Sequence, residues 1–257
     1  MRRKTNKFQS AWGFLPVAVF VSLWETIGRL DFFSGQLLFP PFSAVMEEFY
    51  HLTANGVLGE NFISSLTRVL IGLFSGSLAG IAVGIVMGWK DVANKAFGPI
   101  ISLLFPIPAL GWLPLLMLWV GINEMLPILI IFICSFFPVV YNTATGIRNV
   151  DRSYIQAAEM LGASHLRVLF RIIVPLALPN IFTGLRLEAG MSWRVLIAAE
   201  MVAIPTGIGA LLMKAESLVR VDIILVCLIV LSIMCLIFEK GFALAERHIV
   251  GKWSIHA

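Results

Sequence analysis

The chain has 257 residues, of which 59% are apolar or aromatic and only 13% are charged, and its formal net charge is +4. Soluble domains carry about 25% charged residues, so this composition excludes an ordinary soluble globule and a disordered chain. The 19 Lys and Arg are spread along the chain rather than clustered, which argues against a nucleic-acid-binding protein.

Six apolar stretches are long enough, or nearly so, to cross a hydrocarbon core of about 30 Å, which takes roughly 20 helical residues. They cover residues 11–30, 62–88, 98–120, 126–147, 181–203 and 222–244. Backbone amides inside lipid need partners within their own segment, so helices are expected. The sequence therefore predicts an all-α membrane protein with six transmembrane helices.

The first stretch follows a basic segment that contains Arg2, Arg3, Lys4 and Lys7, an arrangement typical of signal peptides. Because no small-x-small cleavage site follows it, we interpret the stretch as a retained first helix.

The distribution of basic residues predicts the orientation of the chain. If the spans alternate, 13 of the 19 Lys and Arg fall on the side of the N-terminus. The loops on the opposite side hold only Lys214 and Arg220. Since basic loops stay inside the cell, both termini are predicted to be cytoplasmic.

Within 62–88, glycines recur at strict spacing of four. They are Gly72, Gly76, Gly80, Gly84 and Gly88. Small residues on one face let two membrane helices approach closely, so this stripe predicts a tight helix–helix contact. The alternative is that glycine is simply common in membrane helices.

The stretch 98–120 contains Pro99, Pro106, Pro108 and Pro114. Proline removes an amide donor and clashes with the preceding turn, so this helix is expected to be kinked or partly unwound. Broken backbone at membrane depth is tolerated where it is buried in protein or lines a watery cavity. Pro106 and Pro108 are therefore candidate residues of a transport pathway.

Residues 148–180 form a segment too long to be a structureless loop. Ser153 and Gln156 fit a capping box, which predicts a short helix over 154–161. Gly162 follows as a natural helix stop.

Ser164 can cap a second, amphipathic helix, which Pro175 and Pro179 would end. A short capped helix joined through glycine to an amphipathic one suits docking into a groove on another protein. The alternative is a helix that lies on the membrane surface, and it suits residues 165–173 better than 154–161.

The run Gln156-Ala157-Ala158-x-x-x-Gly162, followed by Ile172 and Pro175, resembles the EAA motif of binding-protein-dependent ABC importer permeases. The flanking runs resemble the nitrate, sulfonate, taurine and bicarbonate branch of that family: Asn142-Thr-x-x-Gly146-Ile147-Arg148-Asn149-Val150-Asp151, Leu178-Pro179-x-Ile181-x-x-Gly184-Leu185-Arg186, Ala199-Glu200-Met201 and Gly207-Ile208-Gly209. The motif's leading Glu is Gln156 here, and Glu159, one turn later, is a candidate substitute.

The resemblance implies the type I ABC importer (MetI-like) fold in a multi-pass protein of the bacterial inner membrane. It implies a second permease copy, most simply a homodimer, together with two ATPase subunits and an extracytoplasmic substrate-binding protein. ATP and Mg would be bound by the ATPase, since this chain has no P-loop sequence and no cofactor of its own. The short helix would be the coupling helix, with Tyr154, Gln156, Ala157, Ala158, Glu159, Leu161 and Gly162 as its coupling residues.

The resemblance also suggests a division of the chain. Residues 1–60 would hold the cytoplasmic tail, the first helix and an outer loop. Residues 61–245 would form the transmembrane type-1 domain, with the coupling loop at 148–180. Residues 246–257 would be a second cytoplasmic tail.

Charged residues inside the apolar stretch 181–203 are candidates for the pathway. Arg186, Arg194 and Glu200 fall on one helical arc with Trp193, whereas Glu188 points the other way. One hypothesis is that Arg186 or Arg194 guides an anion. The alternative is that they pair with Glu200 or Glu188 and fix the packing.

A second set of charges lies near the outer end of 62–88. Arg68 is expected to form an ion pair or a helix-end interaction there, with Glu60 and Glu124 near the same surface.

The sequence therefore favours a permease subunit, without catalytic residues, that passes a small anionic solute such as a sulfonate, nitrate or related organic acid. A secondary transporter or channel is the alternative, but inverted repeats typical of that class are not visible. A membrane enzyme would need clustered titratable groups, and no Cys or His spacing resembles a metal site.

Overall fold

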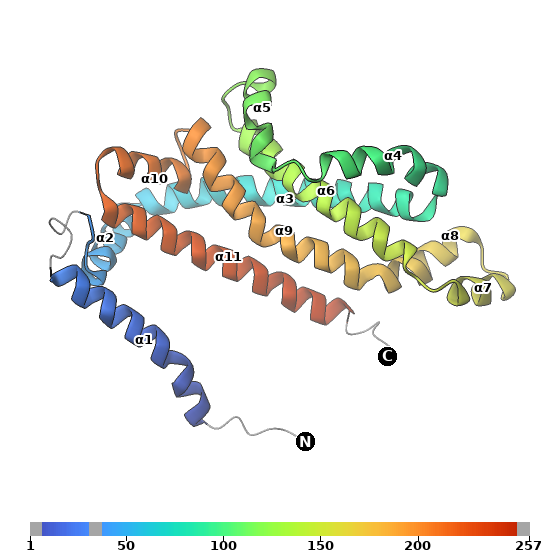
Figure 1. Ribbon diagram of the computed structural model, residues 1–257, viewed down its shortest axis with the longest axis horizontal. Helices are drawn as coiled ribbons and strands as arrows, with labels where there is room; N and C mark the ends of the chain where they lie inside the picture. Colours follow the sequence, from blue (N-terminus) through green and yellow to red (C-terminus); the bar gives the residue numbers. More distant parts are fainter. Residues whose placement is uncertain (1–6, 31–37, 251–257) are drawn as a thin grey trace. The chain divides into compact units, whose positions relative to one another are not determined.

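The computed structural model describes the backbone of residues 7–30 and 38–250, and every regular element in these ranges is a helix. The helices are α1 (Lys7–Arg29), α2 (Phe42–Ala54), α3 (Val57–Trp89), α4 (Asp91–Leu104), α5 (Leu113–Val120), α6 (Met125–Arg148), α7 (Arg152–Met160), α8 (His165–Val168), α9 (Val174–Ala203), α10 (Ile208–Ser217) and α11 (Val221–Val250), with a 3-10 turn at Ala109–Trp112 and a π turn at Leu169–Ile173 (Figure 1). The prediction of an all-α protein is confirmed.

Four helical segments in the described chain are long and apolar enough to cross a membrane. They are α3, α6, the continuous helix from α8 to α9, and α11. A fifth span results if α4 and the helical segment Ala109–Val120 count as one broken span. α1 covers the first predicted stretch but is not among these segments. The count of six spans and the orientation of the termini stay predictions.

The chain divides into two compact units. The first contains the described residues within 1–61 and 211–230. In this unit the Trp24 indole nitrogen donates a hydrogen bond to the Pro40 carbonyl oxygen at 3.1 Å. The Arg220 guanidinium forms an ion pair with Glu48 at 2.9 Å. These contacts tie the end of α1, the start of α2 and the start of α11 together.

The second unit contains residues 62–210 and the described residues from 231 onward. Part of its core lies between α6 and α9, which pack extensively against each other (Figure 1). Ile130 of α6 and Ala199 of α9 are fully buried in one apolar cluster with Leu116 of α5. This pairing positions the polar groups described below.

The predicted distortion of stretch 98–120 is confirmed. α4 ends at Leu104, and the next helical segment begins at Ala109 with its axis turned by 90°. Pro106 and Pro108 lie in the break. Fewer backbone amides donate helical hydrogen bonds there, so the amide donor that proline lacks is not missed.

The predicted end of the second loop helix at Pro175 or Pro179 is wrong. α8 continues through the π turn Leu169–Ile173 directly into α9, and Pro179 lies inside α9. Pro175 occupies the first turn of α9, where a missing amide donor is tolerated. The wider π turn before it also changes which carbonyl faces the proline ring.

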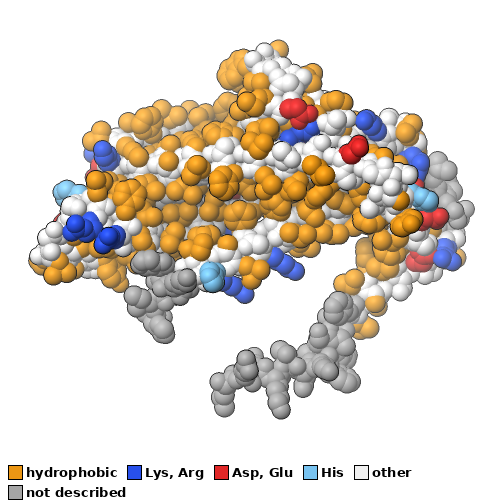
Figure 2. Space-filling model, turned by 180° about the vertical axis from the view of Figure 1, so that it is seen from behind, with side chains coloured by type: hydrophobic (Ala, Val, Ile, Leu, Met, Phe, Trp, Pro, Cys, Tyr) orange, Lys and Arg blue, Asp and Glu red, His pale blue; other side chains and the backbone are white. Residues whose placement is uncertain are grey.

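Hydrophobic side chains dominate the face shown in Figure 2, and charged side chains form only small groups on it. Large apolar side chains at the surface include Phe74 of α3, Leu103 of α4 and Leu118 of α5. Such a surface suits a hydrocarbon environment and protein partners rather than water.

Candidate functional site

The segment after α6 is organised around the short helix α7. The Asp151 carboxylate accepts a hydrogen bond from the Ser153 amide at 2.9 Å, so Asp151 caps the helix. The predicted cap at Ser153 is therefore wrong by two residues: Ser153 lies in the first turn. The amide of Ser153 holds the pKa of the Asp151 carboxyl below its usual range.

Glycine ends α7 as expected. Gly162 has a φ of +77°, a conformation that strongly favours glycine. Its amide donates to the Glu159 carbonyl at 2.9 Å, and the Ala163 amide donates to the Ala158 carbonyl at 3.1 Å. These two bonds form a Schellman motif, which reverses the chain toward α8. Ser164 occupies the cap position of α8 but makes no capping bond through its side chain.

α7 has one buried face and one exposed face. Ala158 packs into an apolar cluster with Ile147 of α6 and Ile173 of the π turn. Met160 and Leu161, in contrast, are 90% and 89% exposed. Other exposed residues of this segment include Tyr154, Gln156, Ala157, Glu159, Gly162, Leu166 and Phe170. We name Tyr154, Met160, Leu161, Leu166 and Phe170 the coupling patch, after the coupling role that the sequence predicts for this segment.

The glycine stripe of α3 lies against α6. A Cβ on Gly72 would lie 2.7 Å from the Ile131 Cβ, and one on Gly80 would lie 2.9 Å from the Phe136 carbonyl oxygen. Gly76 and Gly84 are equally close to α6. Because the nearest atoms include backbone, the two helices touch without room for side chains at these positions.

An ion-pair cluster connects α3, α9 and the chain before α6. Arg68 donates to Glu200 at 2.5 Å and to Glu124 at 2.7 Å. Glu200 is fully buried and also accepts from the Ser65 hydroxyl at 2.9 Å and the Gly209 amide at 3.0 Å. The predicted ion pairing of Arg68 is thus present, and Glu200 is one of its partners.

The Arg68–Glu124 bond predicts a pH dependence of stability. The Arg68 hydrogen bond holds the pKa of the Glu124 carboxyl below its usual range. A lowered pKa stabilises the folded state above the unfolded pKa, and this contribution is lost as pH falls through the folded pKa. Thermal unfolding of wild type and Glu124→Gln is therefore expected to differ at pH 7 and to converge as the pH falls below the folded pKa of the Glu124 carboxyl. Curves that stay equally far apart over this whole pH range would contradict the assignment.

The candidate pathway residues of α9 lie in different surroundings. Trp193 is 1% exposed and stacks on Phe62 of α3, with ring centroids 6.5 Å apart. Arg186 is half exposed and lies 3.6 Å from Glu246. Arg194 is exposed, with its guanidinium 3.7 Å from the Met191 sulfur. Among the described residues, neither Arg186 nor Arg194 pairs with Glu200 or Glu188, as the alternative hypothesis expected. The arginine that pairs with Glu200 is Arg68.

A cavity of about 170 Å³ lies at the helix break. Pro106 and Pro108 line it from the break, Cys134 from α6, and Glu188 and Met191 from α9. The Cys134 thiol donates to the Glu188 carboxylate at 3.3 Å. The sequence missed the combination of Glu188 with Cys134, and the only signal available was a carboxylate within an apolar stretch.

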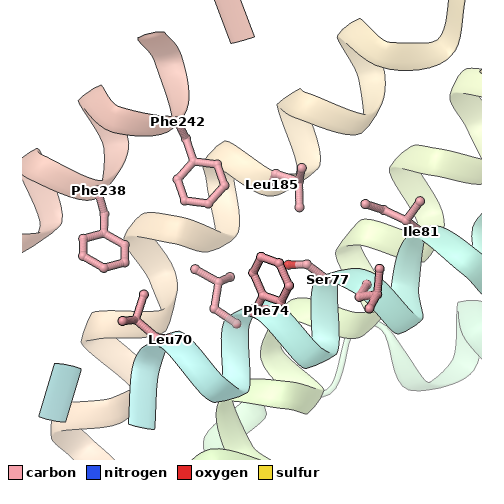
Figure 3. Close-up of a pocket in the computed structure, with 9 residues that line it drawn as sticks. Leu70, Phe74, Ser77, Ile81, Leu185, Phe238 and Phe242 are labelled. Carbon is pink, nitrogen blue, oxygen red and sulfur yellow. The ribbon is translucent and has the colours of Figure 1, made fainter. Parts of the chain in front are cut away.

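A second cavity, of about 190 Å³, is an apolar groove between α3, α9 and α11 (Figure 3). Phe74, Phe238 and Phe242 project into it, and Ser77 is the one polar residue among its nine lining residues. Apart from Ser77, the lining residues offer no group that would orient a polar solute.

Comparisons with known proteins identify the family and the fold of the chain. A family model described as binding-protein-dependent transport system inner membrane component matches residues 76–250. The taurine transport system permease protein TauC of Escherichia coli (strain K12) is 35% identical over 238 residues, which cover 91% of this chain and 86% of that protein. The nitrate import permease protein NrtB of Synechocystis sp. is 32% identical, and the match covers 92% of this chain and 88% of that protein.

Solved structures share the fold at low sequence identity. An inward-facing structure of the MetNI methionine ABC transporter matches with a TM-score of 0.61 and 15% identity, over 72% of this chain and 93% of that one. An amino acid ABC transporter crystallised with histidines matches with a TM-score of 0.62 and 19% identity, over 77% and 97%. The family match and these relatives together show that the chain belongs to the binding-protein-dependent transport system inner membrane components, the permease subunits of ATP-driven importers whose ATPase is a separate chain.

Proposed function

We propose that this permease passes a small anionic solute, of the sulfonate, nitrate or related organic-acid type, and that a separate ATPase drives it through α7. The names of its relatives support this solute class. They are a taurine permease, a nitrate permease and, at 31% identity, a Bacillus subtilis protein named "putative aliphatic sulfonates transport permease protein SsuC".

The coupling patch carries the proposal. α7 is only nine residues long, and a helix of this length is marginal in water without a partner. Its buried side is fixed through Ala158, yet Met160 and Leu161 project outward at its C-terminal end. Apolar side chains on a short, firmly capped helix are suited to a groove on another protein.

The proposal includes the assembly that the family implies. Two ATPase subunits would hold ATP and Mg and contact the coupling patch in the cytosol. A second copy of this chain would complete the pathway, and an extracytoplasmic binding protein would deliver the solute. The positive-inside distribution supports this orientation, because it also places residues 148–180 in the cytosol.

Replacing Leu161 with Asp tests the coupling patch. The side chain is exposed, so the variant should fold, but a charge placed in an apolar contact should weaken ATPase binding. A contact residue of this kind contributes about 2 kcal/mol, which corresponds to roughly 30-fold weaker binding. The measurement is Mg-dependent ATP hydrolysis that co-purifies with the tagged permease from its own membranes.

Val92→Asp is the matched control, since Val92 is an equally exposed apolar residue at the start of α4, outside the coupling patch. The control should retain the ATPase activity that Leu161→Asp loses. Equal retention by both variants would refute coupling through α7. Solute entry into vesicles at full rate without ATP would instead favour a secondary transporter or channel.

A further inference from the structure

The cavity at the helix break contains an acidic group that nothing in the coupling mechanism uses. Glu188 is only 6% exposed, and it lies in α9 within a segment apolar enough to span a membrane. The cavity beside it, of about 170 Å³, has room for a small polar group, since one water needs roughly 10–15 Å³ of such space. Glu188 is the only charged residue among those that line it.

Glu188 lacks the partners that a buried carboxylate needs. In the described part of the chain the only side-chain donor that reaches it is the Cys134 thiol, at 3.3 Å. A thiol is a weak donor, whereas a buried charge is costly unless it is paired and hydrogen-bonded. Glu188 is therefore under-satisfied on the side that faces the cavity.

Glu200, in the same helix, provides an internal comparison. It is even more deeply buried, but it accepts from Arg68, Ser65 and the Gly209 amide. The fold thus supplies a full set of donors to one buried carboxylate of α9 and leaves the other open toward a cavity.

The position of the cavity connects it with transport. It lies where the chain turns by 90° between α4 and Ala109, and broken helices at membrane depth commonly form solute sites. A buried carboxylate that lines a cavity at such a break suits a solute that bears a cationic group.

We propose that the cavity at the helix break is a subsite for the ammonium group of a small amino-bearing acid, with the Glu188 carboxylate as its partner. The inference rests on the proposed function and narrows its solute class to amino-bearing acids. An ammonium would donate up to three hydrogen bonds and supply the charge that Glu188 lacks.

Carbodiimide labelling tests the subsite directly. N,N′-dicyclohexylcarbodiimide modifies carboxyl groups in apolar surroundings when they are protonated, and mass spectrometry measures the modification of Glu188 in the nucleotide-free permease–ATPase complex in nanodiscs. The probes are taurine, which carries an amino group and a sulfonate, and ethanesulfonate, which lacks the amino group. Taurine should protect Glu188 at a concentration about tenfold lower than ethanesulfonate, the effect of one charge-assisted hydrogen bond.

One control accompanies this comparison. Glu200, which Arg68 already pairs, should remain unlabelled under every condition. Equal protection by both probes, or protection by neither, would overturn the inference. Either result leaves the proposed function standing, because ATP-dependent uptake and ATPase retention test that separately.

Discussion

Arg68→Ala is expected to lower the free energy of unfolding by about 3–5 kcal/mol, because it leaves a buried carboxylate without its cation. Arg68 is 3% exposed and bonds Glu200, Glu124 and the Thr206 carbonyl, so one side chain connects three segments. The measurement is the fraction of permease that remains monodisperse in size-exclusion chromatography after heating over a range of temperatures.

Arg186→Ala is the matched control for that experiment. Its guanidinium is half exposed and lies 3.6 Å from Glu246, a geometry that contributes at most about 1 kcal/mol. The Arg68→Ala/Glu200→Ala double variant should be more stable than Arg68→Ala alone, since no unpaired charge stays buried. Coincident melting of Arg68→Ala and Arg186→Ala would contradict a structural role for the cluster.

Gly84→Ala is expected to destabilise the permease by about 1–3 kcal/mol, the usual effect of overpacking. The new Cβ would lie 2.5 Å from the Thr143 Cβ and 2.9 Å from the Val140 carbonyl oxygen, so α3 and α6 would have to separate. Thermal stability of the purified permease measures the effect.

Gly190→Ala provides the comparison, because a Cβ at that position meets nothing within 4 Å. Both changes raise helix propensity equally, so Gly190→Ala should be neutral or slightly stabilising. If the two variants have the same stability, the contact between α3 and α6 does not depend on the missing side chain.

Local sequence patterns predicted features that depend on neighbouring residues alone. The prolines of 98–120 predicted a broken helix because each removes an amide donor and obstructs the preceding turn, and the break between Leu104 and Ala109 confirms it. Gly162 predicted the end of α7, since glycine adopts the positive φ of a C-terminal cap without strain.

Competing local signals gave errors of a few residues. Ser153 and Asp151 can both cap a helix, and the structure selects Asp151. Pro175 and Pro179 were expected to end the helix. The helix continues, because a π turn precedes α9 and Pro175 lies in the first turn of α9. Helix α10 lies between the predicted stretches 181–203 and 222–244, in the connecting segment that holds Lys214.

The sequence by itself determined that this protein is helical and membrane-embedded, because the length and apolarity of each stretch require only local information. The tertiary structure alone decided which charges meet. Arg68 and Glu200 are 132 residues apart, and helical periodicity places each on a face without saying which face lies opposite. Glu188 became a candidate site for the same reason: only the packing of α6, α9 and the helix break creates the cavity that its carboxylate lines.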